Sequence, residues 1–171
     1  TAVGTYSMRT YQVSDIKGNY SQRNYVAFRL ITLLIGLIVI GIYSVAVSPD
    51  SLTLIAVFAY LLFKIDESFC DVLYGVDQRG ERMDYIGISQ FIRGVLAVLA
   101  FSLSLYLSQN IVLAILAMFP AGLIVTISYD IPHAHRIDDI RPSIKAEQAK
   151  NLLVECLPIV LEILFLGMIV S

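Results

Sequence analysis

The chain has 171 residues, of which 57% are hydrophobic and only 15% are charged, and its mean hydropathy is +0.76. A soluble domain of this size is far less apolar, so the composition excludes that class and predicts a membrane protein. The formal net charge is -2. Basic residues do not cluster with stacking aromatic residues, and we therefore expect no nucleic-acid partner.

Residues 1–25 form a polar opening segment, which we interpret as a cytoplasmic connection. The first ten residues, TAVGTYSMRT, lack the charged, apolar and cleavable regions of a signal peptide. The sequence ends at Ser171, directly after an apolar run. Together these features predict a fragment of a longer protein with several membrane spans.

Residues 26–129 are predicted to contain four transmembrane helices. An apolar helix of roughly 20 residues crosses the hydrocarbon core at 1.5 Å per residue. Four apolar segments of suitable length occur at 30–47, 52–74, 85–107 and 111–129. Turn-forming residues separate them, with Pro49 and Asp50 in the first loop, Asn110 in the third, and Pro132 expected to end the fourth span.

The rest of the chain is predicted to be a charged cytoplasmic loop, 130–150, followed by the start of a fifth transmembrane helix at 151–171. This last segment contains Glu155, Pro158 and Glu162 within an otherwise apolar sequence. Glu155 suits the positively polarised start of a helix. Glu162 is a weak candidate for a carboxylate that couples transport to a proton or cation.

The distribution of basic residues predicts the orientation in the membrane. Neither the loop 48–51 nor the loop 108–110 contains Lys or Arg, whereas the N-terminal segment and the loops 75–84 and 130–150 contain several. Short loops rich in Lys and Arg remain on the cytoplasmic side. We therefore expect a multi-pass protein whose N-terminal segment is cytoplasmic.

The second predicted span contains ionisable residues that share one helical face. Lys64, Glu67 and Asp71 follow a spacing of three, four and seven residues, whereas Asp66 points elsewhere. Counted from Tyr74, Asp71 lies about 5 Å, Glu67 about 10 Å and Lys64 about 15 Å from the cytoplasmic end of the helix. An ionisable group at such a depth indicates a functional site by default.

The third predicted span contains a complementary charge. Arg93 lies about 12 Å in from Tyr85, close to the depth of Glu67, and Arg82 and Ser89 share its face. Because consecutive spans with a short loop are antiparallel neighbours, we predict an ion pair between Glu67 and Arg93. Two interpretations are open: structural neutralisation of these charges, or a hydrophilic cavity that opens to the cytoplasm.

Metal and cofactor chemistry receives little support from the sequence. His133 and His135 lack a third ligand at a suitable spacing, and Cys70 and Cys156 fall in apolar segments typical of buried thiols. We therefore predict no metal site, no cofactor and no catalytic residue.

The block 63–94 resembles the polysaccharide-biosynthesis branch of the multidrug/oligosaccharidyl-lipid/polysaccharide exporter superfamily. The resemblance rests on Phe63, Lys64, Glu67, Asp71, Gly75, Gln78, Arg82, Asp84, Ser89, Arg93 and Gly94. The segments YQVSDIKGNYS at 11–21 and YDIPHA at 129–134 support it. The central block is fairly specific, and the flanking segments are less so.

This resemblance implies an all-α polytopic membrane bundle, of which the chain is a fragment equivalent to about helices three to six and the start of helix seven, out of twelve or more. Members of this family flip lipid-linked oligosaccharide, carried on polyprenyl diphosphate, across the bacterial or archaeal cytoplasmic membrane for lipopolysaccharide and other surface polysaccharides. The substrate-binding residues implied here are Lys64, Glu67, Asp71, Arg82 and Arg93. The implied partners are the lipid-linked oligosaccharide, membrane lipids and the polysaccharide polymerase machinery.

Three alternatives stay open at this point. A drug or organic-cation exporter of the same superfamily should prefer an apolar, acidic cavity. The segment DVLYGVDQRGERMD at 71–84 faintly resembles the motif of membrane CDP-alcohol phosphotransferases, but this chain has Ile88, Ile92 and Leu96 at the positions where that motif requires Gly and paired Asp residues. A purely structural subunit would tolerate neutralisation of Lys64, Glu67 and Arg93.

Overall fold

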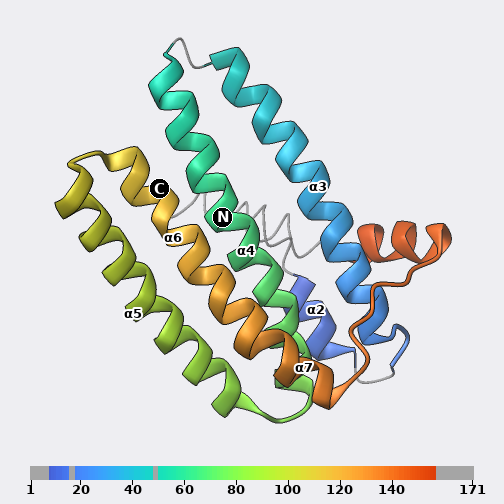
Figure 1. Ribbon diagram of the computed structural model, residues 1–171. Coiled ribbons are helices and arrows are strands. Elements are labelled where there is room, and N and C mark those ends of the chain that lie inside the picture. The colour runs from blue at the N-terminus through green and yellow to red at the C-terminus, as the bar shows by residue number, and fades with distance from the viewer. Residues whose placement is uncertain (1–7, 16–17, 48–49, 157–171) are drawn as a thin grey trace, which may run out of the picture.

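The computed structural model describes residues 8–15, 18–47 and 50–156, whose regular elements are all helices (Figure 1). In chain order they are α2 (Met8–Ser14), α3 (Gln22–Val47), α4 (Ser51–Arg79), α5 (Met83–Ser108), α6 (Ile111–Val125), the π-helical segment η1 (Thr126–Asp130) and α7 (Ile131–Ile137). Residues 146–156 are also helical. Within these ranges no strand occurs, so the all-α prediction is confirmed there.

Three helical runs in the described part of the chain are long and apolar enough to cross a membrane. They are Gln22–Val47, Met83–Ser108 and Ile111–Ile137. With its 29 residues α4 is about 43 Å long, but its charged residues exclude it from this group. The helices extend beyond the predicted spans at their polar ends, because backbone hydrogen bonding continues where the apolar sequence stops.

Side-chain caps fix the starts of α4 and α6. The side chain of Asp50 accepts a hydrogen bond from the backbone N–H of Thr53 at 3.4 Å. Asn110 Oδ1 accepts one from the backbone N–H of Val112 at 2.9 Å. Just before it, Gln109 adopts a left-handed conformation with φ of 49° and ends α5. The turn predicted at 108–110 is therefore present, and α4 begins after Asp50 as predicted, while residues 48–49 of the first predicted turn lie outside the described ranges.

The fourth predicted span does not end before Pro132, as the sequence suggested. The helical run continues through η1 into α7 and ends at Ile137. Pro132 occupies the first turn of α7, where a missing N–H costs little because the preceding π-helical segment has already changed the hydrogen-bonding register. The predicted loop 130–150 is accordingly non-helical only between 138 and 145.

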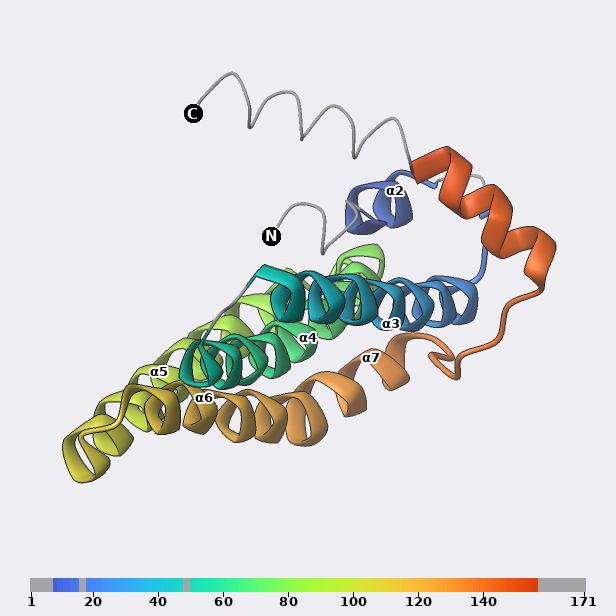
Figure 2. The same ribbon diagram turned by 90° about the horizontal axis from the view of Figure 1, so that it is seen from above.

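Consecutive long helices run in opposite directions, so that the neighbours α4 and α6 are parallel; α6 packs against both α4 and α5, and α3 packs on the other side of α4 (Figure 1). The end of α3, the start of α4 and the α5–α6 loop lie at one end, and α7 and the α4–α5 loop lie at the other. In the view from above, α2 and the helical stretch 146–156 lie on the same side of the bundle (Figure 2). The rest of the predicted fifth span, 157–171 with Pro158 and Glu162, is outside the described residues.

A small apolar core joins α2 to the bundle. Met8 from α2 packs with Phe28 from α3, Val72 from α4 and Leu152 from the stretch 146–156. Just after α2, the carboxylate of Asp15 accepts hydrogen bonds from the backbone N–H groups of Asn19 and Tyr20 and from the hydroxyl of Tyr25. Burial alone would raise the pKa of Asp15, but these three hydrogen bonds lower it below its ordinary value.

Close contact between α2 and α4 depends on a glycine. The buried side chain of Gln12 donates hydrogen bonds to Gln22 and to the carbonyl oxygen of Val72 at 2.7 Å and 3.3 Å. A Cβ atom added at Gly75 would collide with this side chain. Gly75 therefore permits α2 to lie directly against α4, and this contact places Arg9 next to the site described below.

Candidate functional site

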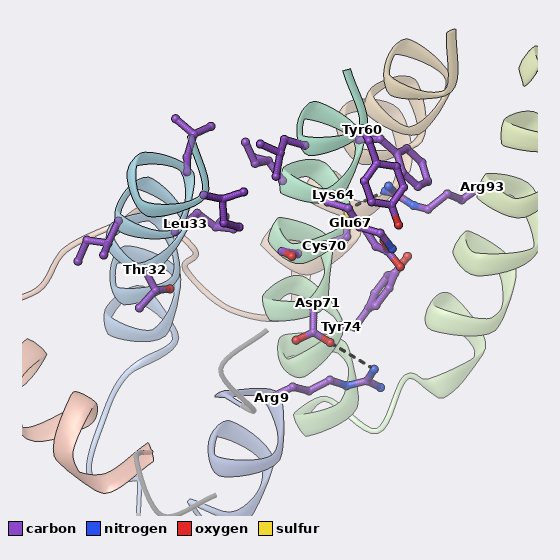
Figure 3. Close-up of a pocket in the computed structure, with 18 of the residues that line it drawn as sticks. Arg9, Thr32, Leu33, Tyr60, Lys64, Glu67, Cys70, Asp71, Tyr74 and Arg93 are labelled. Atoms are coloured by element: carbon purple, nitrogen blue, oxygen red, sulfur yellow. Dashed lines mark hydrogen bonds and ion pairs between the residues drawn. The ribbon is translucent and has the colours of Figure 1, made fainter. Parts of the chain in front are cut away.

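A cavity of about 910 Å³ lies along α4, between α3 and α5 (Figure 3). Most of its lining is apolar and comes from α3 and α4, for example Leu33 and Val39. Polar and charged side chains come from one stripe of α4, from α5 and from Arg9 of α2. The cavity thus joins an apolar wall to a charged one.

The charged stripe predicted on α4 lies on the cavity wall. Lys64, Glu67 and Asp71 all line it, with Ser68 beside them. Lys64 Nζ and Glu67 Oε2 form an ion pair at 2.5 Å. The ammonium group also lies 5.5 Å from the ring centroid of Tyr60. Lys64 is therefore neutralised by a neighbour on its own helix.

Asp71 contacts two arginines that the sequence did not single out. Its Oδ2 accepts a hydrogen bond from Arg29 Nη2 at 2.7 Å, and its Oδ1 lies 3.8 Å from Arg9 Nη1. The Arg29 side chain is fully buried, whereas that of Arg9 is 28% exposed and lines the cavity. No sequence pattern indicated Arg9 as a site residue, because it lies far outside the predicted spans. Arg29 directly precedes an apolar run, and this position could have indicated it as a candidate.

The predicted Glu67–Arg93 ion pair is wrong. Arg93 instead donates from Nη1 to Asp66 Oδ2 at 2.5 Å and from Nη2 to Asp130 Oδ2 at 3.0 Å. The same Nη2 contacts the hydroxyl of Thr126 at 2.8 Å. The prediction placed the face of α4 that carries Glu67 against Arg93, whereas Arg93 meets the face that carries Asp66, at an interface that α6 and η1 share. Asp66, which points away from the stripe as predicted, is turned toward that interface and meets Arg93 there.

The Arg93 cluster, defined as Asp66, Cys70, Arg93, Thr126 and Asp130, is almost completely buried. It contains two carboxylates for one guanidinium, and Cys70 also contacts both Arg93 and Asp130. The hydroxyl of Thr126 donates to Asp66 Oδ1 at 2.6 Å. Within the described ranges, Arg93 Nε and Asp130 Oδ1 have no hydrogen-bond partner. Arg93 and Cys70 also reach the cavity wall, so the cluster borders the cavity.

Two local features of α6 and η1 make the Arg93 cluster possible. A Cβ atom at Gly122 would lie 2.7 Å from Asp66 Oδ2 and 3.2 Å from Arg93 Nη1, so glycine is needed for this close approach. Thr126 and Asp130 are the first and last residues of η1. The π-helical segment therefore carries both of its buried polar side chains toward Arg93, as is common for π-bulges at functional positions.

The remaining predicted site residues lie elsewhere. Arg82 is exposed outside the cavity, where it forms a bidentate ion pair with Asp84 at 2.9 Å and 2.7 Å and lies 3.7 Å from the centroid of the Tyr85 ring. Its spacing from Arg93 suggested a shared face, but Arg82 directly precedes α5 and turns away. Glu162 is outside the described residues.

No metal-binding arrangement is found in the part of the chain that the structure describes. Groups of three or more His, Cys, Asp or Glu side chains that could hold an ion do not occur there. The space between Asp66 and Asp130 is filled by the guanidinium group of Arg93. His133 stacks on the ring of Tyr129 with centroids 4.1 Å apart.

Comparison of the chain with protein-family models, curated proteins and solved structures gives no match in any of the three.

Proposed function

We propose that this chain is part of a membrane transporter that flips lipid-linked oligosaccharide, carried on polyprenyl diphosphate, across the cytoplasmic membrane for cell-surface polysaccharide synthesis. The observation that carries this proposal is a cavity of about 910 Å³ in a bundle of apolar helices, with charged side chains on one wall and apolar ones on the other. A sugar diphosphate headgroup needs polar contacts inside the membrane, whereas its lipid tail remains in the hydrocarbon. The resemblance of residues 63–94 supports the same substrate class.

In this proposal the substrate-contacting side chains are those that line the cavity. Lys64 offers hydrogen-bond donors to phosphate or sugar oxygens, and Glu67 and Asp71 orient the neighbouring cations or accept hydrogen bonds from sugar hydroxyls. Arg93 contributes at the cavity wall, and its two buried carboxylate partners position it there. The full bundle has twelve or more helices in a bacterial or archaeal membrane, with the end that carries α2 and α7 on the cytoplasmic side and polysaccharide polymerase machinery as a partner.

Complementation of a flippase-deficient bacterium with the full-length protein tests this function. Wild-type protein should restore surface glycan, and Glu67→Gln should reduce it about tenfold or more, since a contact to a charged group is lost. Glu147→Gln, at an exposed position away from the cavity, is the matched control and should behave as wild type. Failure of the wild-type protein with every glycan lineage tested would refute the function, and full activity of Glu67→Gln would refute the assigned contact.

An exporter of amphiphilic organic cations is the second candidate, because the largely apolar lining with Glu67 and Asp71 in it also suits such a ligand. The two candidates differ in the charge they select. Tight binding of tetraphenylphosphonium to the full-length protein, with no effect on surface glycan, would favour the exporter.

A further inference from the structure

The charges around the cavity are balanced differently along its length. Arg93 is outnumbered by two buried carboxylates, so an anion approaching it meets excess negative charge. Lys64 is neutralised by Glu67 at 2.5 Å. Neither cation, although both stood out in the sequence, is surplus among the described residues. A phosphate group gains most beside a cation that no carboxylate contacts at hydrogen-bond distance.

A loosely held cation of this kind occurs at the end of the cavity beside α2. Here the carboxylate of Asp71 contacts two guanidinium groups at unequal distances. Arg29 is its close partner at 2.7 Å, while Arg9 Nη1 is 3.8 Å away, beyond hydrogen-bond distance. Arg9 Nε donates to the neutral amide oxygen of Gln78 at 3.1 Å. Its Cζ also lies 5.8 Å from the ring centroid of Tyr74. Because its contact with Asp71 is the longer of the two, Arg9 is the more loosely paired cation, and its Nη atoms can accept a new anionic partner while the Arg29–Asp71 pair persists.

The position of Arg9 makes it reachable from two sides. It lines the large cavity, and it also lines a smaller hollow of about 490 Å³ with Thr10, Val13 and Gln78 at the surface of α2. Figure 3 shows the Arg9 side chain extending toward Asp71 below Glu67 and Lys64 on the same wall. A group that enters past α2 meets this guanidinium before it reaches the deeper charges.

We infer that Arg9 forms a diphosphate-binding site at the end of the cavity beside α2, where an incoming anionic headgroup is first held. The inference deepens the proposed function and rests on it for the source of the diphosphate. A guanidinium group presents a planar fork of donors that matches two phosphate oxygens, which an ammonium group lacks. The bound diphosphate replaces Asp71 as the partner of Arg9.

Titration of the full-length protein in lipid nanodiscs tests the site with three probes: farnesyl diphosphate, inorganic pyrophosphate and farnesol. Wild-type protein should bind farnesyl diphosphate, and Arg9→Gln should raise its Kd about tenfold. Arg9→Lys, which keeps the charge but loses the fork, should raise it about threefold. Arg23→Gln is the matched control, because Arg23 is an exposed arginine at the same end of the bundle whose ion pair with Asp139 lies outside the cavity, and its Kd should equal that of wild type.

The probes separate the sources of the diphosphate. Arg9-dependent binding of farnesyl diphosphate alone supports a lipid-borne headgroup, and equal Arg9 dependence with pyrophosphate supports a site that recognises the diphosphate itself. An unchanged Kd in both Arg9 variants would overturn the inference and leave the proposed function standing. The proposed function fails separately, if wild-type protein restores no surface glycan. Should Arg9→Gln lower the unfolding temperature, Arg9→Lys supplies the decisive comparison.

Discussion

For the Arg93 cluster, we predict that Asp66→Asn lowers the free energy of unfolding of the wild-type protein but raises that of the Arg93→Gln variant. The side chains of Arg93, Asp66 and Asp130 are 9%, 3% and 1% exposed. Arg93→Gln leaves two buried carboxylates without their cation, which should lower the free energy of unfolding by about 3–5 kcal/mol. Asp66→Asn leaves one guanidinium with one carboxylate, and should cost only the lost charge-assisted hydrogen bond, about 1.5–3 kcal/mol.

The double variant provides the sharper comparison. In the Arg93→Gln variant the buried charge of Asp66 has lost its cationic partner and destabilises the fold. Adding Asp66→Asn to that variant should therefore raise the free energy of unfolding instead of lowering it. The full-length protein would be unfolded in bicelles by steric trapping for all four members of the cycle. The exposed pair Arg23–Asp139, at 3.6 Å, is the control, and Arg23→Gln should change the free energy by less than about 1 kcal/mol.

The charge argument would be refuted if Asp66→Asn destabilised the wild-type and Arg93→Gln proteins equally. It would also be refuted if Arg93→Gln cost no more than Asp66→Asn, because the cluster would then not depend on its one cation.

Three further predictions concern positions at which backbone or charge is tightly constrained. Gly122→Ala should lower the free energy of unfolding by about 1–3 kcal/mol, because the added Cβ atom would force the Asp66–Arg93 ion pair apart. Gly87 has open space around it, so Gly87→Ala should not lower this free energy. Equal effects of the two substitutions in unfolding experiments would contradict the close packing at Gly122. Gly75→Ala should displace Gln12 and detach α2, which limited proteolysis would detect as faster cleavage near residue 15; protection equal to that of wild type would count against it. Because the pKa of Asp15 is lowered in the folded state, the ionised carboxylate stabilises the fold. This contribution is fully present above the unfolded-state pKa of about 4 and is lost as the pH falls through the lower folded-state pKa. Asp15→Asn should therefore flatten the loss of stability in an acid titration, and an unchanged acid profile would exclude this role.

Local sequence patterns were sufficient to predict the long helices α3, α4, α5 and α6 and the charged stripe, but not α2, η1 or α7. Lys64, Glu67 and Asp71 share a face of any α-helix, whatever surrounds it, and the structure places all three on the cavity wall. The turn at 108–110 was likewise predictable, because the capping preference of Asn110 is a local property.

The partners of these charges could not be predicted from the same pattern. Glu67 was paired with Arg93 because the two lie at similar depths on consecutive helices. Which face of α4 meets α5 and α6 depends on the tertiary fold, and it is the face that carries Asp66. The π-helical segment that presents Asp130 has no sequence signature of its own, so Pro132 looked like a terminator. Arg9 reaches the cavity only because α2 folds back against α4, a contact between residues more than 60 positions apart in the chain, as its hydrogen bond to Gln78 shows.

The two polar faces of α4 constrain how the bundle can move. A shift of one residue along the helix corresponds to a rotation of about 100°, which would pull Asp66 off Arg93 and turn Asp71 away from Arg29 at the same time. The Arg93 cluster thus fastens α4, α5 and η1 into one rigid block. In the proposed transporter, the cavity is therefore expected to open and close at the interface between this block and α3, where the contacts are largely apolar and the Arg29–Asp71 pair would act as the pivot.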